Sequence, residues 1–132
     1  MAIVAYLNAW GLLRAGIADF PDRYRDRSFL QGMLNEQTFV GRQLTGFTES
    51  YWSTPEIALA EVKRAGLEVV SYAAAEGFVA GMRPLIERLA AERPDAYENV
   101  VAIAVATCEL PQYRDTGDHL HIAVRKRPDH TT

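Results

Sequence analysis

Residues 54–72, TPEIALAEVKRAGLEVVSY, contain a complete helix signal followed by a strand signal. Thr54 belongs to the residue types that cap helices with a side-chain oxygen, and Pro55 suits the first helical position because its fixed φ is already helical. Gly66 can adopt the left-handed conformation that ends a helix. The apolar and β-branched residues 67–72 then predict a strand. This stretch therefore predicts one helix–strand unit of an α/β domain.

Two further stretches complete a small sheet. Residues 2–7, AIVAYL, are apolar without interruption, which predicts a strand covered on both faces, as in a parallel sheet. Residues 119–125 alternate instead, with Leu120, Ile122 and Val124 on one face, which predicts a strand with one buried face. The strand–helix–strand order predicts that the first two strands are parallel, and the last strand can lie between them, antiparallel to both.

The segment after the first strand contains a short helical pattern. Trp10, Leu13 and Ile17 are spaced as the inward face of an amphipathic helix. Gly11 and Gly16 are poor helix formers and weaken this pattern.

Prolines and glycines divide the rest of the chain. Pro21 predicts the start of a second helix, which directs Met33 toward a core. Residues 35–53 contain glycines and many polar residues, which predict a loop or short irregular pieces. Pro84 and Pro94 predict the starts of two more helices.

The composition is that of one globular domain spanning residues 1–132. Its net charge of −3 disfavours a nucleic-acid partner, because nucleic-acid binders usually carry a basic face. No apolar run approaches the roughly 20 residues that cross a bilayer, so we expect no membrane partner. The single cysteine, Cys108, cannot form an internal disulfide, which favours a reducing, cytoplasmic setting.

Three quoted stretches, in their order along the chain, resemble the C-terminal half of a class I S-adenosylmethionine-dependent methyltransferase. AIVAYLN is similar to the fifth strand of that family, TPEIALAEVKRAGLEVVSYAAAEG to its last helix and sixth strand, and HLHIAVRKRP to its seventh strand. Residues 8–53 resemble a helical lid, and residues 78–111 resemble an insertion between the last two strands. The resemblance implies a partial Rossmann-like sheet of three strands.

The sequence departs from the family in one large respect. The family binds its cofactor in an N-terminal half, with a glycine-rich turn after the first strand and an acidic residue after the second. This sequence contains neither feature, so we expect S-adenosylmethionine to be bound only in a full-length relative. The resemblance implies a substrate-side fragment that acts on a small-molecule methyl acceptor and is inactive alone. The apolar first strand agrees, since its composition predicts a neighbour on each side.

The resemblance implies that ligands lie at the carboxyl ends of the parallel strands. The candidate substrate-binding residues are Tyr6, Asn8, Trp10, Tyr51, Trp52 and Glu76, the two at 51 and 52 as part of the lid. Each has a structural alternative: Tyr6 and Trp10 as packed residues, Tyr51 and Trp52 as members of a small satellite core, and Asn8 as a helix cap. Glu76 is either solvated or orients a substrate hydroxyl or amine. No residue is identified as catalytic.

The histidines allow one other kind of site. His119 and His121 are two residues apart on a predicted strand, so they share a face and form a pair that metals use. The candidates for a third ligand, Cys108 and Asp118, are close to this pair only in sequence. We therefore expect no metal site.

A non-enzymatic function is the alternative. If the edge of the first strand is free, its unpaired N–H and C=O groups are a template for a second copy. Two copies would then form an isologous homodimer with a continuous six-stranded sheet.

Overall fold

The computed structural model describes residues 1–36, 38–40 and 49–127. It is an α/β structure, as predicted. The strands are β1 (Ala2–Asn8), β2 (Thr38–Val40), β3 (Glu49–Ser53), β4 (Leu67–Ala74) and β5 (His119–Lys126). The helices are α1 (Ala9–Asp19), α2 (Arg27–Glu36), α3 (Pro55–Arg64), α4 (Arg83–Glu92), α5 (Pro94–Thr107) and α6 (Pro111–Arg114), with 3-10 helices η1 (Pro21–Arg25) and η2 (Gly77–Val79).

The strand order is β2-β3-β1-β5-β4. β5 lies antiparallel between β1 and β4, which confirms the predicted place of the last strand. The predicted count of three strands is wrong, because β3 pairs parallel with the end of β1 at Leu7 and Asn8 and β2 pairs with β3. These two strands lie within residues 35–53, for which a loop was predicted. The sequence pattern did not predict these strands because each is short. Residues 41–48, which separate them, lie outside the described part of the chain.

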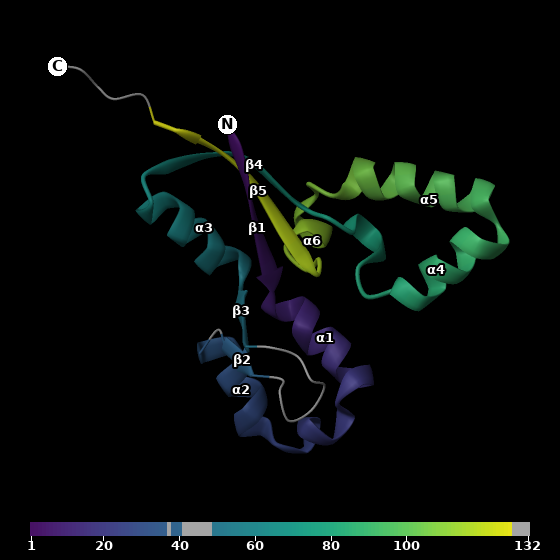
Figure 1. Ribbon diagram of the computed structural model, residues 1–132, viewed down its shortest axis with the longest axis horizontal. Coiled ribbons are helices and arrows are strands. Elements are labelled where there is room, and N and C mark those ends of the chain that lie inside the picture. Colours follow the sequence, from purple (N-terminus) through teal and green to yellow (C-terminus); the bar gives the residue numbers. More distant parts are fainter. Residues whose placement is uncertain (37, 41–48, 128–132) are drawn as a thin grey trace.

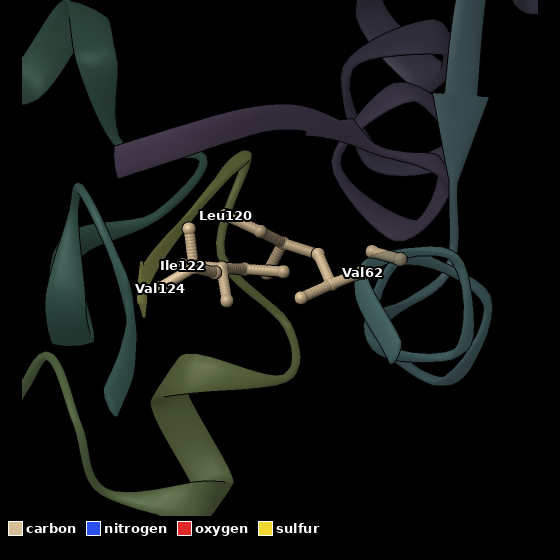
Figure 2. Close-up of a cluster of buried hydrophobic side chains, with 5 residues drawn as sticks. Val62, Leu120, Ile122 and Val124 are labelled. Atoms are coloured by element: carbon tan, nitrogen blue, oxygen red, sulfur yellow. The ribbon is translucent and has the colours of Figure 1, made fainter. Parts of the chain in front are cut away.

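The main core lies between β5 and α3. Leu120, Ile122 and Val124 are at most 1% exposed, which confirms the alternation predicted for this strand. Figure 2 shows these three side chains and Val62 of α3 gathered in one cluster. Antiparallel register places Val4 and Tyr6 of β1 on the same face, and both pack against the cluster.

The opposite face of the sheet is largely exposed. The register places Ile3 beside Ala123 and Ala5 beside His121 on this face. Ile3 is 73% exposed, and Ala5 and His121 are also exposed. Along the other edge of β1, only Leu7 and Asn8 pair with β3. Residues 2–6 therefore present an apolar strand edge with which no other described residue pairs.

α3 begins and ends where the sequence predicts, but its cap differs. Pro55 occupies the first turn, and Gly66 takes a φ of 75° just after the helix. The Thr54 side chain makes no capping hydrogen bond, so the predicted cap is wrong. The first-turn Glu56 and the last-turn Lys63 carry charges that favour the helix dipole.

The predicted inward face of α1 is wrong at Trp10 and Ile17, whereas Leu13 packs against a buried cluster as predicted. Trp10 is 42% exposed and Ile17 is 64% exposed, whereas Gly11 and Gly16 are buried. A Cβ atom on Gly11 would lie 2.7 Å from the Cα atom of Asp118. Because the glycines have no side chains, other segments can approach this side of the helix backbone closely. Their effect on packing outweighs their cost to helix propensity.

A second, smaller core supports α1. Leu12, Phe20 and Met33 are its buried members, and Trp52 of β3 packs against them. Pro21 starts η1 rather than a long helix, and Asp26 accepts hydrogen bonds from the backbone of Ser28 and Phe29 at the start of α2. The chain thus makes two short helices where one was predicted.

α4 and α5 form a hairpin that lies away from α3 (Figure 1). Each begins with a proline in its first turn, as predicted. Several apolar side chains of the hairpin are exposed, among them Leu85, Val101, Ile103 and Val105. Among the described residues, no helix is long and apolar enough to cross a membrane.

Tyr72 on β4 anchors a polar cluster at the start of β5. Its hydroxyl donates a 2.7 Å hydrogen bond to Asp115, and the Arg114 guanidinium lies 3.9 Å from the centre of its ring. Burial, together with the hydrogen bond to Asp115, raises the pKa of Tyr72 from 10.0 to about 12. Burial acts to raise the pKa of Asp115, but hydrogen bonds from Arg114 and Tyr72 lower it overall.

We therefore expect the folded chain to lose stability at alkaline pH because of Tyr72. A raised pKa in the folded state favours the neutral phenol, so the contribution is complete below pH 10 and is lost as pH rises toward 12. In denaturant unfolding, the Tyr72→Phe variant should lose less stability between pH 10 and 12 than the unmodified chain. Tyr97→Phe is a matched control, because Tyr97 lies on α5 and has no hydrogen bond to Asp115. Equal alkaline slopes for all three proteins would contradict the prediction.

Candidate functional site

A cleft of about 850 Å³ is the main concave feature near the ends of the parallel strands. One wall is α1, and the other is the α4–α5 hairpin. The ends of β3, β4 and β5 meet between them. The lining residues on α1 are Gly11, Arg14, Ala15, Ala18 and Asp19; those between the walls include Trp52, Ala75, Glu76, Asp118 and His119; those on the hairpin include Ile86, Tyr97, Val101 and Val105.

Topology explains why the cleft lies here. β1, β3 and β4 run in the same direction, because β1 and β4 both pair antiparallel with β5 and β3 pairs parallel with β1. Their carboxyl ends therefore reach the same edge of the sheet, where open α/β sheets bind ligands. β5 runs the other way, so its first residues reach this edge too.

Glu76 and His119 form a polar pair in the cleft. The carboxylate Oε1 of Glu76 lies 2.5 Å from Nδ1 of His119. Oε2 accepts backbone N–H groups from Asp118 at 3.0 Å and from His119 at 3.2 Å. The carboxylate thus joins the end of β4 to the start of β5, and it fixes the orientation of the imidazole.

Arg14 and Asp118 form a second pair beside the first. Nη2 of Arg14 donates to Oδ1 of Asp118 at 2.5 Å and to the Thr116 carbonyl at 2.8 Å. The other carboxylate oxygen of Asp118 accepts the Gly81 N–H at 3.2 Å. Among the described residues, Nε of Arg14 is the one buried side-chain nitrogen or oxygen without a hydrogen-bond partner. This pair joins α1 to the loop before β5, which holds Thr116 and Asp118, and to the loop before α4, which holds Gly81.

Two of the six predicted substrate-binding residues line the cleft. Glu76 contributes the carboxylate described above, and Trp52 contributes an aromatic ring whose Nε1 donates to Ser50. The structure therefore brings together one residue that follows β4 and one residue of the predicted lid.

Tyr6 and Tyr51 lie elsewhere, around Glu61 of α3. The Tyr51 hydroxyl donates to Glu61 at 2.5 Å, and this hydrogen bond, together with burial, raises the pKa of Tyr51. Burial, followed by the charge of Glu61, raises the pKa of Tyr6. Tyr6 packs against the β5–α3 core, which is the structural alternative for that residue. Neither tyrosine lines the cleft.

Asn8 has a structural role. It is fully buried, and its Nδ2 donates to the carbonyls of Asp115 at 3.1 Å and Gly117 at 2.7 Å. Its Oδ1 accepts the Trp10 N–H and caps α1, as the sequence allowed. Trp10 itself is half-exposed and is not part of the cleft lining.

Arg14, Asp118 and His119 are the site residues that sequence reasoning missed as ligand-binding groups. His119 was considered only with His121, as a metal pair. Among the described residues, no group of three or more His, Cys, Asp or Glu side chains is placed to hold a metal ion. The available signal was topological: a middle strand that runs antiparallel brings its first residues to the carboxyl ends of its neighbours.

Comparison with known protein families and with curated proteins finds no match to this chain. Its function is therefore inferred from the geometry of the cleft and the order of the strands.

The Asn8 contacts predict a large effect on stability. Asn8→Ala removes the cap of α1 and leaves two carbonyls near the cleft without their donor, so the free energy of unfolding should fall by about 2–4 kcal/mol. Urea unfolding measures this change. Asn99→Ala, at an exposed position of α5, is the matched control and should change it by about 0.5 kcal/mol or less. A similar small change for both variants would show that the Asn8 network contributes little.

Proposed function

We propose that this chain is the substrate-side portion of an S-adenosylmethionine-dependent methyltransferase that acts on a small molecule. The observation that carries the proposal is the arrangement β1-β5-β4, in which an antiparallel strand lies between two parallel ones. The resemblance implies this order for its fifth, seventh and sixth strands. The cleft at the carboxyl ends of β1 and β4 adds support, because the resemblance implies an acceptor site there.

The cleft has the size and lining of a small-molecule site. Its volume of about 850 Å³ falls within the roughly 300–1,000 Å³ typical of ligand sites. The hairpin wall is mostly apolar, with Ile86 and Val101 among its residues beside the charged Arg83 and Glu87, and Trp52 offers an aromatic surface. Glu76 and His119 supply a few fixed polar groups. This combination suits a molecule with an apolar body and a polar substituent.

The described residues do not fit the cofactor. The turn from β1 into α1 is closed by the fully buried Asn8, and no glycine-rich turn follows a described strand. The proposal therefore assigns the cofactor to another part of a complete enzyme. The contribution of this chain is to bind and orient the acceptor and to exclude water from it.

Fluorescence of the two tryptophans tests the proposal. Trp52 lines the cleft and Trp10 does not, so Trp10→Phe and Trp52→Phe each leave one reporter. We expect catechol and tyramine, as simple acceptors, to change the emission of the Trp10→Phe variant and not that of Trp52→Phe. S-adenosylhomocysteine at millimolar concentration should change neither. Micromolar binding of S-adenosylhomocysteine, or methyl transfer by the isolated chain, would contradict this division of roles.

A second candidate is a non-enzymatic module that forms a homodimer through the edge of β1. Residues 2–6 of this edge are apolar and have no pairing partner within the described part of the chain, and Ile3 on the adjoining face is 73% exposed. Antiparallel pairing of β1 with a second copy would satisfy the free backbone groups of both.

Analytical ultracentrifugation tests the second candidate. Ala5 lies in the middle of the free edge and is exposed, so Ala5→Lys places two charges near the proposed twofold axis. We expect a dimer for the unmodified chain and a monomer for this variant. Ala60→Lys, at an exposed position of α3, should remain a dimer. An unmodified chain that is monomeric at high concentration excludes this candidate.

A further inference from the structure

We propose that the cleft binds an organic cation: an amine whose ammonium group lies at Asp19 and whose apolar body lies along α1 toward Trp52. This inference rests on the proposed function, because it names the class of molecule for the same cleft.

One face of α1 forms a wall of the cleft. Its lining residues recur at the spacing of a single helix face, and they are Gly11, Arg14, Ala15, Ala18 and Asp19. Ala15 and Ala18 leave a smooth apolar strip between the two charged residues. Asp19 lies five residues beyond Arg14, which corresponds to about 7.5 Å along the helix axis. A phenyl ring with a short chain fits this length, with its charged group at the Asp19 end.

Asp19 is the one charge of the lining that no opposite charge balances within the described part of the chain. The other charged side chains of the lining form pairs: Arg14 with Asp118 at 2.5 Å, Arg83 with Glu87 at 2.7 Å, and His119 with Glu76 at 2.5 Å. No hydrogen bond or ion pair joins the Asp19 side chain to another described residue. The described lining therefore carries an excess of negative charge, which attracts a cation.

The position of Asp19 in α1 strengthens this negative potential. Asp19 is the last residue of the helix, and the last turn contains no basic residue. The helix macrodipole already places partial negative charge at this end, so an acidic side chain there disfavours the helix. A bound cation interacts favourably with both the carboxylate and the end of the helix. Asp19 thus lies where it suits binding and does not suit helix stability.

The first turn of α4, on the opposite wall, is poorly suited to an anion. Arg83 and Pro84 of this turn line the cleft, and helix N-termini commonly bind anions through free N–H groups. Pro84 has no N–H, and the N–H groups of Leu85 and Ile86 both donate to the Met82 carbonyl. Arg83 is already paired within its own helix. Among the described lining residues, neither arginine is therefore unpaired for a carboxylate or phosphate group.

Aromatic side chains complete the site. Trp52 of β3 and Tyr97 of α5 both line the cleft. The faces of such rings attract cations, and they also pack against an apolar ring. The described lining thus matches an arylalkylamine, which combines an aromatic body with a positive charge.

Three probes share one body and differ in the charge of the end group: 2-phenylethylamine is a cation at neutral pH, 2-phenylethanol is uncharged, and 3-phenylpropanoate is an anion. Their dissociation constants can be measured by NMR titration of the intact chain at low salt. We expect the amine to bind about fivefold more tightly than the alcohol, and the anion to bind most weakly. Salt at about 0.5 M should reduce the preference for the amine and leave the alcohol unaffected, because salt screens charges.

Asp19→Asn tests the residue, and Asp22→Asn is the matched control. Asp22 lies nearby in η1, outside the lining, and its side chain is 88% exposed. Both variants remove one negative charge from the same part of the chain. We expect Asp19→Asn to reduce the preference for the amine over the alcohol to about twofold or less, and Asp22→Asn to leave it unchanged.

Urea unfolding separates binding from a structural role. Because the acidic side chain opposes the helix dipole, Asp19→Asn should unfold at the same or a higher urea concentration than the unmodified chain. A lower midpoint would assign Asp19 a structural role and overturn the inference. Equal affinities for the amine and the alcohol, a preference for 3-phenylpropanoate, an unchanged preference in Asp19→Asn, or no binding of the amine at millimolar concentration would also overturn it.

Failure of this inference is distinguishable from failure of the proposed function. Catechol that changes the emission of the Trp10→Phe variant, together with equal affinities for the three probes, would leave the proposed function intact and remove only the preference for a cation. Micromolar binding of S-adenosylhomocysteine would contradict the proposed function, whereas a dependence of amine binding on Asp19 would stand.

Discussion

The structure depends on the pairing of β5 with both β1 and β4. β5 is the last strand, and it joins the first strand of the chain to a strand that precedes it by more than 40 residues. Its three apolar side chains fill the core against α3, so one strand supplies both the backbone pairing and the largest share of buried aliphatic surface. Contacts between such distant segments carry a high loop-closure cost, which the burial of Leu120, Ile122 and Val124 offsets.

The antiparallel direction of β5 has a direct chemical consequence. A parallel strand in this place would bring its last residues, Arg125 and Lys126, to the edge where β1 and β4 end. The antiparallel strand brings Asp118 and His119 there instead. Glu76 then binds the N–H groups of both residues. The contact that closes the sheet at this end is thus the same contact that orients the imidazole, and fold stability and site geometry share these residues.

The sequence predicted the elements whose patterns are local. The alternation of β5, the two prolines that start α4 and α5, and the Gly66 stop after α3 are signals within a few residues, and the structure has all of them. The inward face of α1 was not predictable in this way. Its orientation is set by Asp118, which lies more than 100 residues away and packs on Gly11.

The candidate site was predictable to the same limited extent. Glu76 follows from the rule that ligands lie at the carboxyl ends of parallel strands, because it comes directly after β4, whereas Trp52 was named as part of the lid. Tyr6, named by the same rule, and Tyr51, named with the lid, both lie near Glu61 on the α3 side, because successive strand residues alternate between the faces of the sheet. Strand position alone therefore selects the correct edge, whereas the register with β5 decides which side chains reach the cleft.

The exposed face of the sheet lies beside the cleft. Ile3, Ala5 and His121 share that face with His119, which places the exposed apolar surface beside the cleft. α3 covers one face of this mixed sheet (Figure 1), and antiparallel pairing allows the other face to be exposed to water. A second layer on this face would enclose the side of the cleft that holds His119 and lower its exposure to water. Shielding of that kind strengthens a carboxylate–imidazole contact, because electrostatic interactions weaken in a high-dielectric solvent. The exposed apolar surface and His119 therefore belong to one continuous region of the sheet. A further layer would cover both.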